Sequence, residues 1–291
     1  MRPNKKFLKQ PRSFWAQVRL ISITLGYSRG GQFKTYTIEQ IIECLKTQGL
    51  SVLHLADSAN KPTPEGALLV EYFQCRAKSL DEYAKPNFMN RSQAKVEFDK
   101  LHETLKPTIK LPLNKQKGDK KHFAYLTGIV NMLTAENLQD ADFDPDPRRL
   151  TVITTGEKPL RTFARRVDGA YPSAVNPLAI WEIKEYYGTK TFGSRVADGV
   201  YETMLDGYEI EELRISENIE VGHYLIVDDY FTWWSCGKSY LCRMVDMVHE
   251  GFVDEVIFGR QVLTRWPEIV KSWRKDITMS TVEGRERLLR S

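Results

Sequence analysis

The chain has 291 residues, of which 42% are apolar and 27% are charged, a composition typical of folded globular proteins. Its net charge of +4 is too small to indicate a nucleic-acid partner by itself. No apolar run approaches the roughly 20 residues of a transmembrane helix, and the basic N-terminus lacks the apolar stretch of a signal peptide. We therefore expect a cytoplasmic protein without a membrane partner.

The N-terminal part shows mainly helical patterns. Thr37 and Gln40 form a capping box ahead of an apolar helical face, and Gly49 is a natural stop for that helix. A second helical pattern follows Pro64. The two helices could form a helix-turn-helix DNA reader, or they could pack as ordinary helices, which we favour. The glycine-rich loop before them carries Arg29 and Lys34, which are candidate contacts to a DNA backbone.

The composition changes over residues 104–122, where prolines, a glycine and many lysines predict a linker or an exposed loop. We therefore divide the chain into a mainly helical region, 1–110, which could recognise DNA, and a second domain, 111–291.

The second domain alternates helix and strand patterns. Helices are expected over 120–138, 194–210 and 239–252, and strands over 149–155, 161–172, 177–188, 223–231 and 254–259. This order, α-β-β-β-α-β-α-β, predicts a mixed α/β (α+β) fold in which helices flank a central mixed sheet.

Two neighbouring strands carry the residues with the clearest chemical potential. Asp168 ends the second predicted strand, and Glu182 and Lys184 lie two apart in the third, so that both point to one face of the sheet. Hydrolysis of a phosphodiester needs a metal to stabilise the charged transition state and a group that orients water. Magnesium prefers carboxylate oxygens, and a nearby lysine can serve the water. A salt bridge between Glu182 and Lys184 is the structural alternative.

Asp168, thirteen further residues and then Glu182-Ile183-Lys184 resemble the D…ExK signature of the PD-(D/E)XK nuclease superfamily, to which type II restriction endonucleases belong. The resemblance covers about residues 120 to 260. It implies a restriction-endonuclease-like core in which Asp168, Glu182 and the carbonyl of Ile183 hold Mg²⁺ while Lys184 serves the attacking water. That family often adds an acid from a helix before the strands, for which Glu136 is the candidate. Val167 stands where the family name has proline.

Other residues are weaker candidates for DNA contacts. Arg166 is placed on the strand face of Asp168, Lys190 and Arg195 open the following helix, and Lys238 lies beside two tryptophans. At least one of these tryptophans is expected in the core. The histidines and cysteines show no zinc spacing, and the motifs of serine hydrolases, P-loop NTPases and dinucleotide-binding proteins are not found.

The resemblance predicts a Mg²⁺-dependent endonuclease that cuts double-stranded DNA at a specific sequence, as type II restriction enzymes do, and that acts as a homodimer. A structure-specific, repair or nicking nuclease would use the same residues. A third hypothesis is a non-catalytic DNA-binding regulatory protein with an inert second domain.

Overall fold

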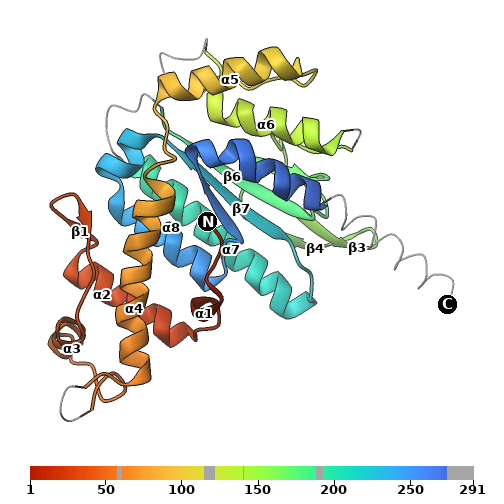
Figure 1. Cartoon of the computed structure of the whole chain (residues 1–291). Coiled ribbons are helices and arrows are strands. Elements are labelled where there is room, and N and C mark those ends of the chain that lie inside the picture. The colour runs from red at the N-terminus through yellow and green to blue at the C-terminus, as the bar shows by residue number, and fades with distance from the viewer. Residues whose placement is uncertain (58–60, 115–121, 140, 188–192, 274–291) are drawn as a thin grey trace.

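A mixed sheet lies at the centre of the C-terminal part of the protein, with helices on both of its faces (Figure 1). The computed structural model describes residues 1–57, 61–114, 122–139, 141–187 and 193–273. The predicted mixed α/β class is confirmed. Among the described residues, no helix combines the length and apolarity needed to cross a lipid bilayer.

The strands of this sheet stand in the order β5 (Gly169–Tyr171), β6 (Ala179–Glu185), β7 (Gly222–Asp228) and β8 (Glu255–Phe258). β5 runs antiparallel to β6, whereas β6, β7 and β8 are parallel. Parallel neighbours need long crossover connections. These crossovers contain α7 (Ser194–Glu217) between β6 and β7, and α8 (Lys238–Glu250) between β7 and β8.

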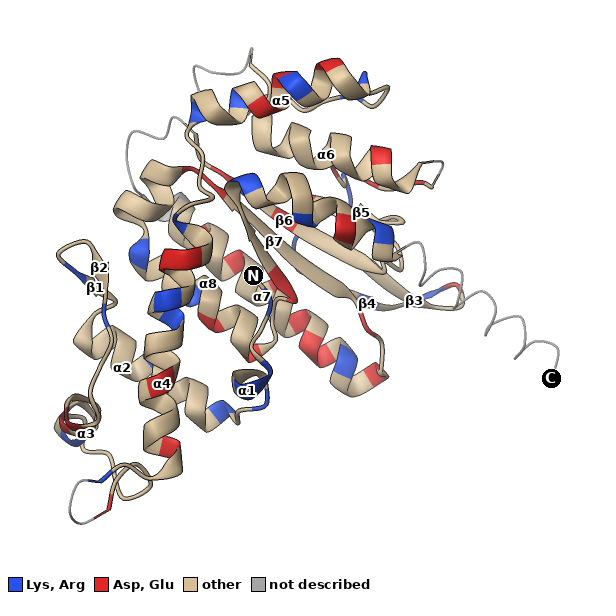
Figure 2. Ribbon diagram, viewed as in Figure 1, with Lys and Arg blue, Asp and Glu red and all other residues tan. Residues whose placement is uncertain are grey.

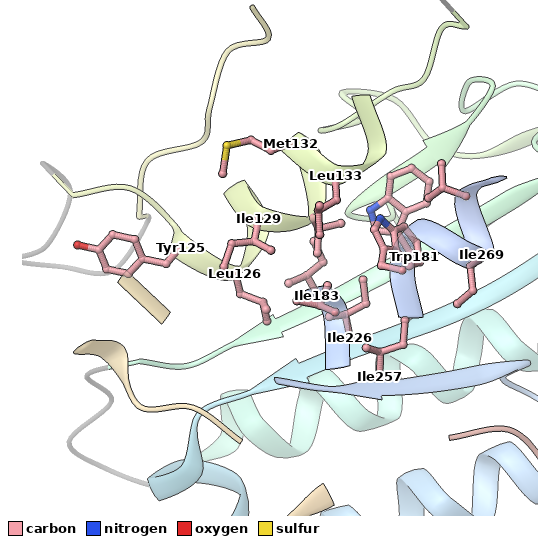
Figure 3. Close-up of a cluster of buried hydrophobic side chains, with 14 of the residues drawn as sticks. Tyr125, Leu126, Ile129, Met132, Leu133, Trp181, Ile183, Ile226, Ile257 and Ile269 are labelled. Atoms are coloured by element: carbon pink, nitrogen blue, oxygen red, sulfur yellow. The ribbon is translucent and has the colours of Figure 1, made fainter. Parts of the chain in front are cut away.

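One face of the sheet is apolar and covered by α6 (Tyr125–Leu138) and the helix over 262–273 (Figure 3). The alternation of β6 directs Trp181 and Ile183 to this face. At the end of the strand, Glu185 accepts a hydrogen bond of 3.0 Å from the amide of Thr127 and caps the first turn of α6, which has no side-chain cap of its own. Helix α5 (Arg91–Leu105) packs on the outer side of α6.

The opposite face of the sheet is covered by α7 and α8. A hairpin of β3 (Val152–Thr155) and β4 (Lys158–Thr162) precedes β5, and its Ile153 joins a small core with Ile180 of β6 and Leu213 of α7. Residues of the hairpin, the sheet and α7 thus share one small core.

The N-terminal part is helical, as predicted. It contains α1 (Lys5–Leu8), α2 (Arg12–Leu25), α3 (Ile38–Thr47), α4 (Pro64–Ser79), the hairpin β1 (Ser28–Arg29) and β2 (Gln32–Phe33), and the π-helical turn η1 (Leu80–Ala84). The capping box of Thr37 and Gln40 is confirmed. Helices α1 and α4 pack against α8. The helix-turn-helix alternative is wrong, because residues 48–63 separate α3 from α4 where that motif has a turn of about three or four residues.

The strand predicted over 161–172 and the division at residue 110 differ from the observed structure. The strand predicted over 161–172 is wrong in its middle, because β4 ends at Thr162 and β5 begins at Gly169, with irregular chain between them. The division at residue 110 separates α5 from α6, although Phe98 of α5 lies in the same apolar cluster as Tyr125 of α6. The remaining short elements are the π-helical turn η2 (Tyr230–Cys236) and the 3₁₀ turn η3 (Gly259–Gln261).

Candidate active site

Glu182 and Lys184 lie side by side on the face of β6 that α7 covers. Glu182 is fully buried, and Lys184 is 5% exposed. The ammonium of Lys184 donates to Glu182 Oε2 at 2.7 Å and lies 3.3 Å from Glu202 Oε2 of α7. The place opposite Lys184 on α7 is taken by Gly199, where a Cβ would lie 3.2 Å from Lys184 Cδ. The small residue therefore leaves room for the lysine.

Asp168 joins this pair from the residue just before β5. Its Oδ2 accepts a hydrogen bond of 2.8 Å from the amide of Ile183, and its own amide donates to Glu182 Oε1 at 3.3 Å. The structure therefore brings Asp168, Glu182 and Lys184 together.

Arg165 is a further member of the cluster that the sequence analysis missed. Its guanidinium lies 2.9 Å from Glu182 Oε1 and 2.5 Å from Asp206 Oδ2 of α7. Arg166 was the predicted contact because a continuous strand would place it on the face of Asp168. Since 163–168 is not a strand, this alternation does not apply: Arg166 is exposed and Arg165 points inward.

The segment that carries Arg165 is fastened along one side of α7. Arg161 pairs with Glu212 at 2.9 Å, the amide of Ala164 donates to Glu209 at 3.0 Å, and Arg165 pairs with Asp206. These acids and Glu202 recur every three or four residues and so share one side of the helix. Figure 2 shows acidic residues repeated along α7. We call this stretch, residues 161–168, the active-site strap.

The electrostatics of the cluster follow from burial and from an excess of carboxylates. Burial and the charge of Glu182 raise the pKa of Asp168 to about 6. Burial alone would raise the pKa of Glu182, but the charges of Lys184 and Arg165 outweigh it and lower that pKa. Burial would lower the pKa of Lys184, but the charges of Glu182 and Asp168 hold it above its ordinary value. Lys184 is therefore protonated at neutral pH.

Asp206 is the least satisfied acid of the cluster. It is fully buried, its Oδ1 has no hydrogen-bond partner among the described residues, and burial together with the charge of Glu182 raises its pKa to about 8. A buried carboxylate oxygen without a partner is costly, and a bound cation would offset that cost.

The donors fit a hard divalent cation. Asp168, Glu182 and the carbonyl of Ile183 offer oxygens, and Mg²⁺ is commonly bound by one or two carboxylates together with waters and substrate phosphate. In the described part of the chain, no three His, Cys, Asp or Glu side chains already form a metal-binding group. Both oxygens of Glu182 are engaged, so a metal ion would compete with Arg165 for Oε1.

Glu136 does not join the site. It is exposed on α6, which covers the opposite face of the sheet. The prediction failed because a helix pattern does not indicate which face of the sheet the helix will cover.

The other predicted DNA contacts lie apart from this cluster. Lys34 donates to the carbonyl of Leu25, and Lys238 is buried and donates to the carbonyl of Trp234, so neither ammonium is directed to solvent. Both tryptophans of that loop, Trp233 and Trp234, are buried, as expected for at least one of them. Arg29 is exposed at the β1–β2 hairpin. Lys190 and the side chain of Arg195 lie outside the described residues.

Comparison with known proteins gives a family for this chain. It belongs to the family described as domain of unknown function DUF7687, whose model matches residues 89–273. Residues 1–83 match a second domain of unknown function, DUF7690. No curated protein and no solved structure matches the chain. The boundary between the two matched regions falls between residues 83 and 89, so α5 belongs to the same matched region as the sheet.

Proposed function

We propose that the protein is a Mg²⁺-dependent deoxyribonuclease with a restriction-endonuclease-like core of the PD-(D/E)XK type. One observation carries the proposal: Asp168, at the start of the edge strand β5, meets Glu182 and Lys184 of the neighbouring strand β6 in one cluster. The antiparallel step from β5 to β6 and the α7 crossover to a parallel β7 agree with the strand order that the resemblance implies. Burying ionised groups at the centre of a strand costs desolvation free energy that pairing repays only in part, which favours a functional role for this cluster.

The roles of the residues follow from their contacts. Asp168, Glu182 and the carbonyl of Ile183 would hold the metal, which supplies charge stabilisation at the phosphate in the transition state. Lys184 already donates a hydrogen bond to Glu182, and it would act as the donor that orients the attacking water or the phosphate. Arg165 holds Glu182 and Asp206 from the active-site strap.

The proposed substrate is double-stranded DNA, cut at a specific sequence by a cytoplasmic enzyme, and the proposed active form is a homodimer. The N-terminal helical part would add contacts to the DNA backbone and bases. A repair or structure-specific nuclease would use the same cluster on a different substrate.

A second candidate function is a non-catalytic DNA-binding regulatory protein. One observation favours it: Glu182 is fully buried, with both oxygens paired to Lys184 and Arg165, which is also how a structural ion-pair cluster is satisfied. The two candidates differ in what removal of the Glu182 charge does to DNA cleavage.

Cleavage of a long, sequence-diverse DNA in Mg²⁺ separates these functions. We expect the wild type to produce fragments, and Glu182→Gln, Asp168→Asn and Lys184→Ala each to lose about a hundredfold or more in rate, since each removes a group that contacts the metal or the water. Glu217→Gln is the matched control, because it removes an exposed carboxylate at the C-terminal end of α7, beyond the turns that hold the strap. Its rate should stay near that of the wild type.

Metal exchange gives an independent check. Ca²⁺ in place of Mg²⁺ should support DNA binding without cutting, and EDTA should stop cutting. Discrete fragments would indicate a site-specific enzyme, and a smear would indicate a repair or nonspecific nuclease. If the three site variants cut as fast as the wild type, the proposal is wrong. If the wild type binds DNA but cuts neither duplex nor branched substrates, the regulatory function is the better one.

A further inference from the structure

Two loops from distant parts of the chain form one aromatic and basic layer. The ring of Phe33, in the β1–β2 hairpin, lies 5.3 Å from that of Trp234, in η2. The ammonium of Lys238 lies 5.7 Å from the first ring and 4.5 Å from the second. Such cation–π contacts fasten the hairpin to the sheet domain.

Arg243 of α8 extends this layer to α7. Its guanidinium lies 5.6 Å from the ring of Tyr27 and 5.3 Å from that of Tyr201, and it donates to both hydroxyls. Tyr201 directly precedes Glu202, whose carboxylate lies 3.3 Å from the ammonium of Lys184. The layer therefore ends on the same turn of α7 as Glu202, with the two side chains on different sides of the helix.

Three exposed rings belong either to this layer or to η2, the turn that carries Trp234. Tyr201 is 46% exposed, Tyr230 39% and Phe231 52%, and the last two belong to η2. Lys85 is exposed beside η2, with its ammonium 5.4 Å from the ring of Trp234. We call the solvent-facing set the aromatic–basic surface, which consists of Arg29, Lys85, Tyr201, Tyr230, Phe231 and the half-buried Arg243.

A surface that combines exposed rings with cations can distinguish an unpaired nucleic-acid strand from a duplex. Cations alone suit any phosphate backbone. An aromatic side chain, however, stacks only on a base whose face is free, and the bases inside a duplex cover one another. Exposed rings among cations therefore favour an unpaired strand over a duplex.

We propose that the aromatic–basic surface binds unpaired DNA next to the active site, so that the substrate class is DNA with a single-stranded segment beside the scissile phosphate. The inference rests on the proposed nuclease chemistry and favours its structure-specific form over cleavage of a plain duplex. Arg29 and Lys85 contact phosphates, and Tyr201, Tyr230 and Phe231 stack on bases. Arg243 orients Tyr201 between the surface and Glu202.

Binding of a fluorescent oligothymidylate by the full chain, in EDTA so that nothing is cut, tests the surface directly. We expect the wild type to bind this strand more tightly than a blunt duplex of the same length. Phe231→Ala tests stacking, because it removes an exposed ring. Tyr201→Phe tests the contact to Arg243, because it removes only the hydroxyl that accepts from that side chain. Loss of one stacked ring should weaken binding about tenfold, and the loss of only the Tyr201 hydroxyl should weaken it less. Lys85→Glu should weaken binding and reduce its salt dependence by about one phosphate contact.

Two matched controls lie on the far side of the sheet. Phe123→Ala removes a ring that is 39% exposed, and Lys100→Glu reverses an exposed charge on α5. Both should bind as the wild type does. Circular dichroism of each variant checks that the fold is retained.

The inference is overturned if Phe231→Ala and Lys85→Glu bind oligothymidylate as the wild type does, or if the wild type prefers the blunt duplex. Tighter binding of oligouridylate would overturn the assignment to DNA. Cleavage measured separately in Mg²⁺ distinguishes the two proposals. If blunt duplex is cut and the single strand is not bound, only the inference fails; if the strand is bound through these residues and no DNA is cut, only the nuclease function fails.

Discussion

Two arginines, one on α4 and one in the active-site strap, illustrate the difference between a structural ion pair and a candidate site. Arg76 of α4 is 1% exposed and pairs with Asp246 of α8 at 3.1 Å. It also donates to Ser22 at 3.0 Å and lies 4.9 Å from the ring of Phe73. One cation meets one carboxylate, and aromatic rings enclose the pair.

Arg165 lies in the opposite kind of setting. It is 21% exposed and shares its cluster with one other cation, Lys184, and with four carboxylates, those of Asp168, Glu182, Glu202 and Asp206. The cluster thus carries more negative than positive charge and opens to solvent at Glu202, which is 45% exposed. The enclosed and balanced pair of Arg76 stabilises the fold. The cluster of Arg165, with more carboxylates than cations and an opening to solvent, has carboxylate oxygens that can bind a cation.

The largest expected effect is on the enclosed pair. Arg76→Ala should lower the free energy of unfolding by about 3 kcal/mol, because it leaves the largely buried carboxylate of Asp246 without its cation. Urea denaturation measures the change. The double variant Arg76→Met, Asp246→Leu should recover a large part of the loss, and a loss below about 1 kcal/mol in the single variant would contradict the comparison.

Arg165→Ala should destabilise the fold less, by about 2 kcal/mol, because Lys184 still pairs with Glu182 and water reaches the gap. The variant should nevertheless lose DNA cleavage, since Glu182 and the strap lose their shared contact. Denaturation and cleavage are measured on the same preparations, with Arg166→Ala as the exposed neighbouring control. Equal destabilisation by Arg165→Ala and Arg76→Ala would remove the distinction between the two clusters.

The excess of carboxylate predicts a dependence of stability on pH. The pKa of Asp206 is raised in the folded state to about 8, from an ordinary value near 3.8, so its contribution to stability is present at low pH and is lost as the pH rises toward and through 8. Asp206→Asn should therefore be more stable than the wild type at pH 9, by about 1–2 kcal/mol, and show little gain at pH 4. Denaturation of both proteins across this range checks the difference. A gain that is independent of pH would contradict it.

The smallest expected effect on the fold is at Gly199. A methyl group there meets the hydroxyl of Tyr186 at 2.9 Å and Lys184 Cδ at 3.2 Å, while alanine favours the helix. The opposed effects leave the free energy of unfolding within about 1 kcal/mol of the wild type. The displaced Lys184 should still lower the cleavage rate. Gly193→Ala, where a Cβ contacts nothing within 4 Å, is the control.

The sequence predicted those features that depend on local pattern. The capping box at Thr37 and the shared face of Glu182 and Lys184 both follow from the spacing of a few residues. Arg165 was missed because its orientation depends on the irregular strap, which α7 holds by side-chain contacts from a remote part of the chain. Lys34 and Lys238 were assigned to DNA because a loop sequence does not show which carbonyl an ammonium will reach. Glu136 failed because the face that a helix covers is a tertiary property.

The attachment of the strap to α7 also constrains which insertions related proteins can tolerate. Arg161, Ala164 and Arg165 each meet a different turn of α7, so one added residue between 161 and 168 would shift every later contact and move Asp168 away from Glu182. The turn at Gly156, whose φ is +58° and around which nothing lies within 4 Å of a Cβ, bears no such constraint. Length differences within this family are therefore expected to collect at the β3–β4 turn, while the strap keeps its length.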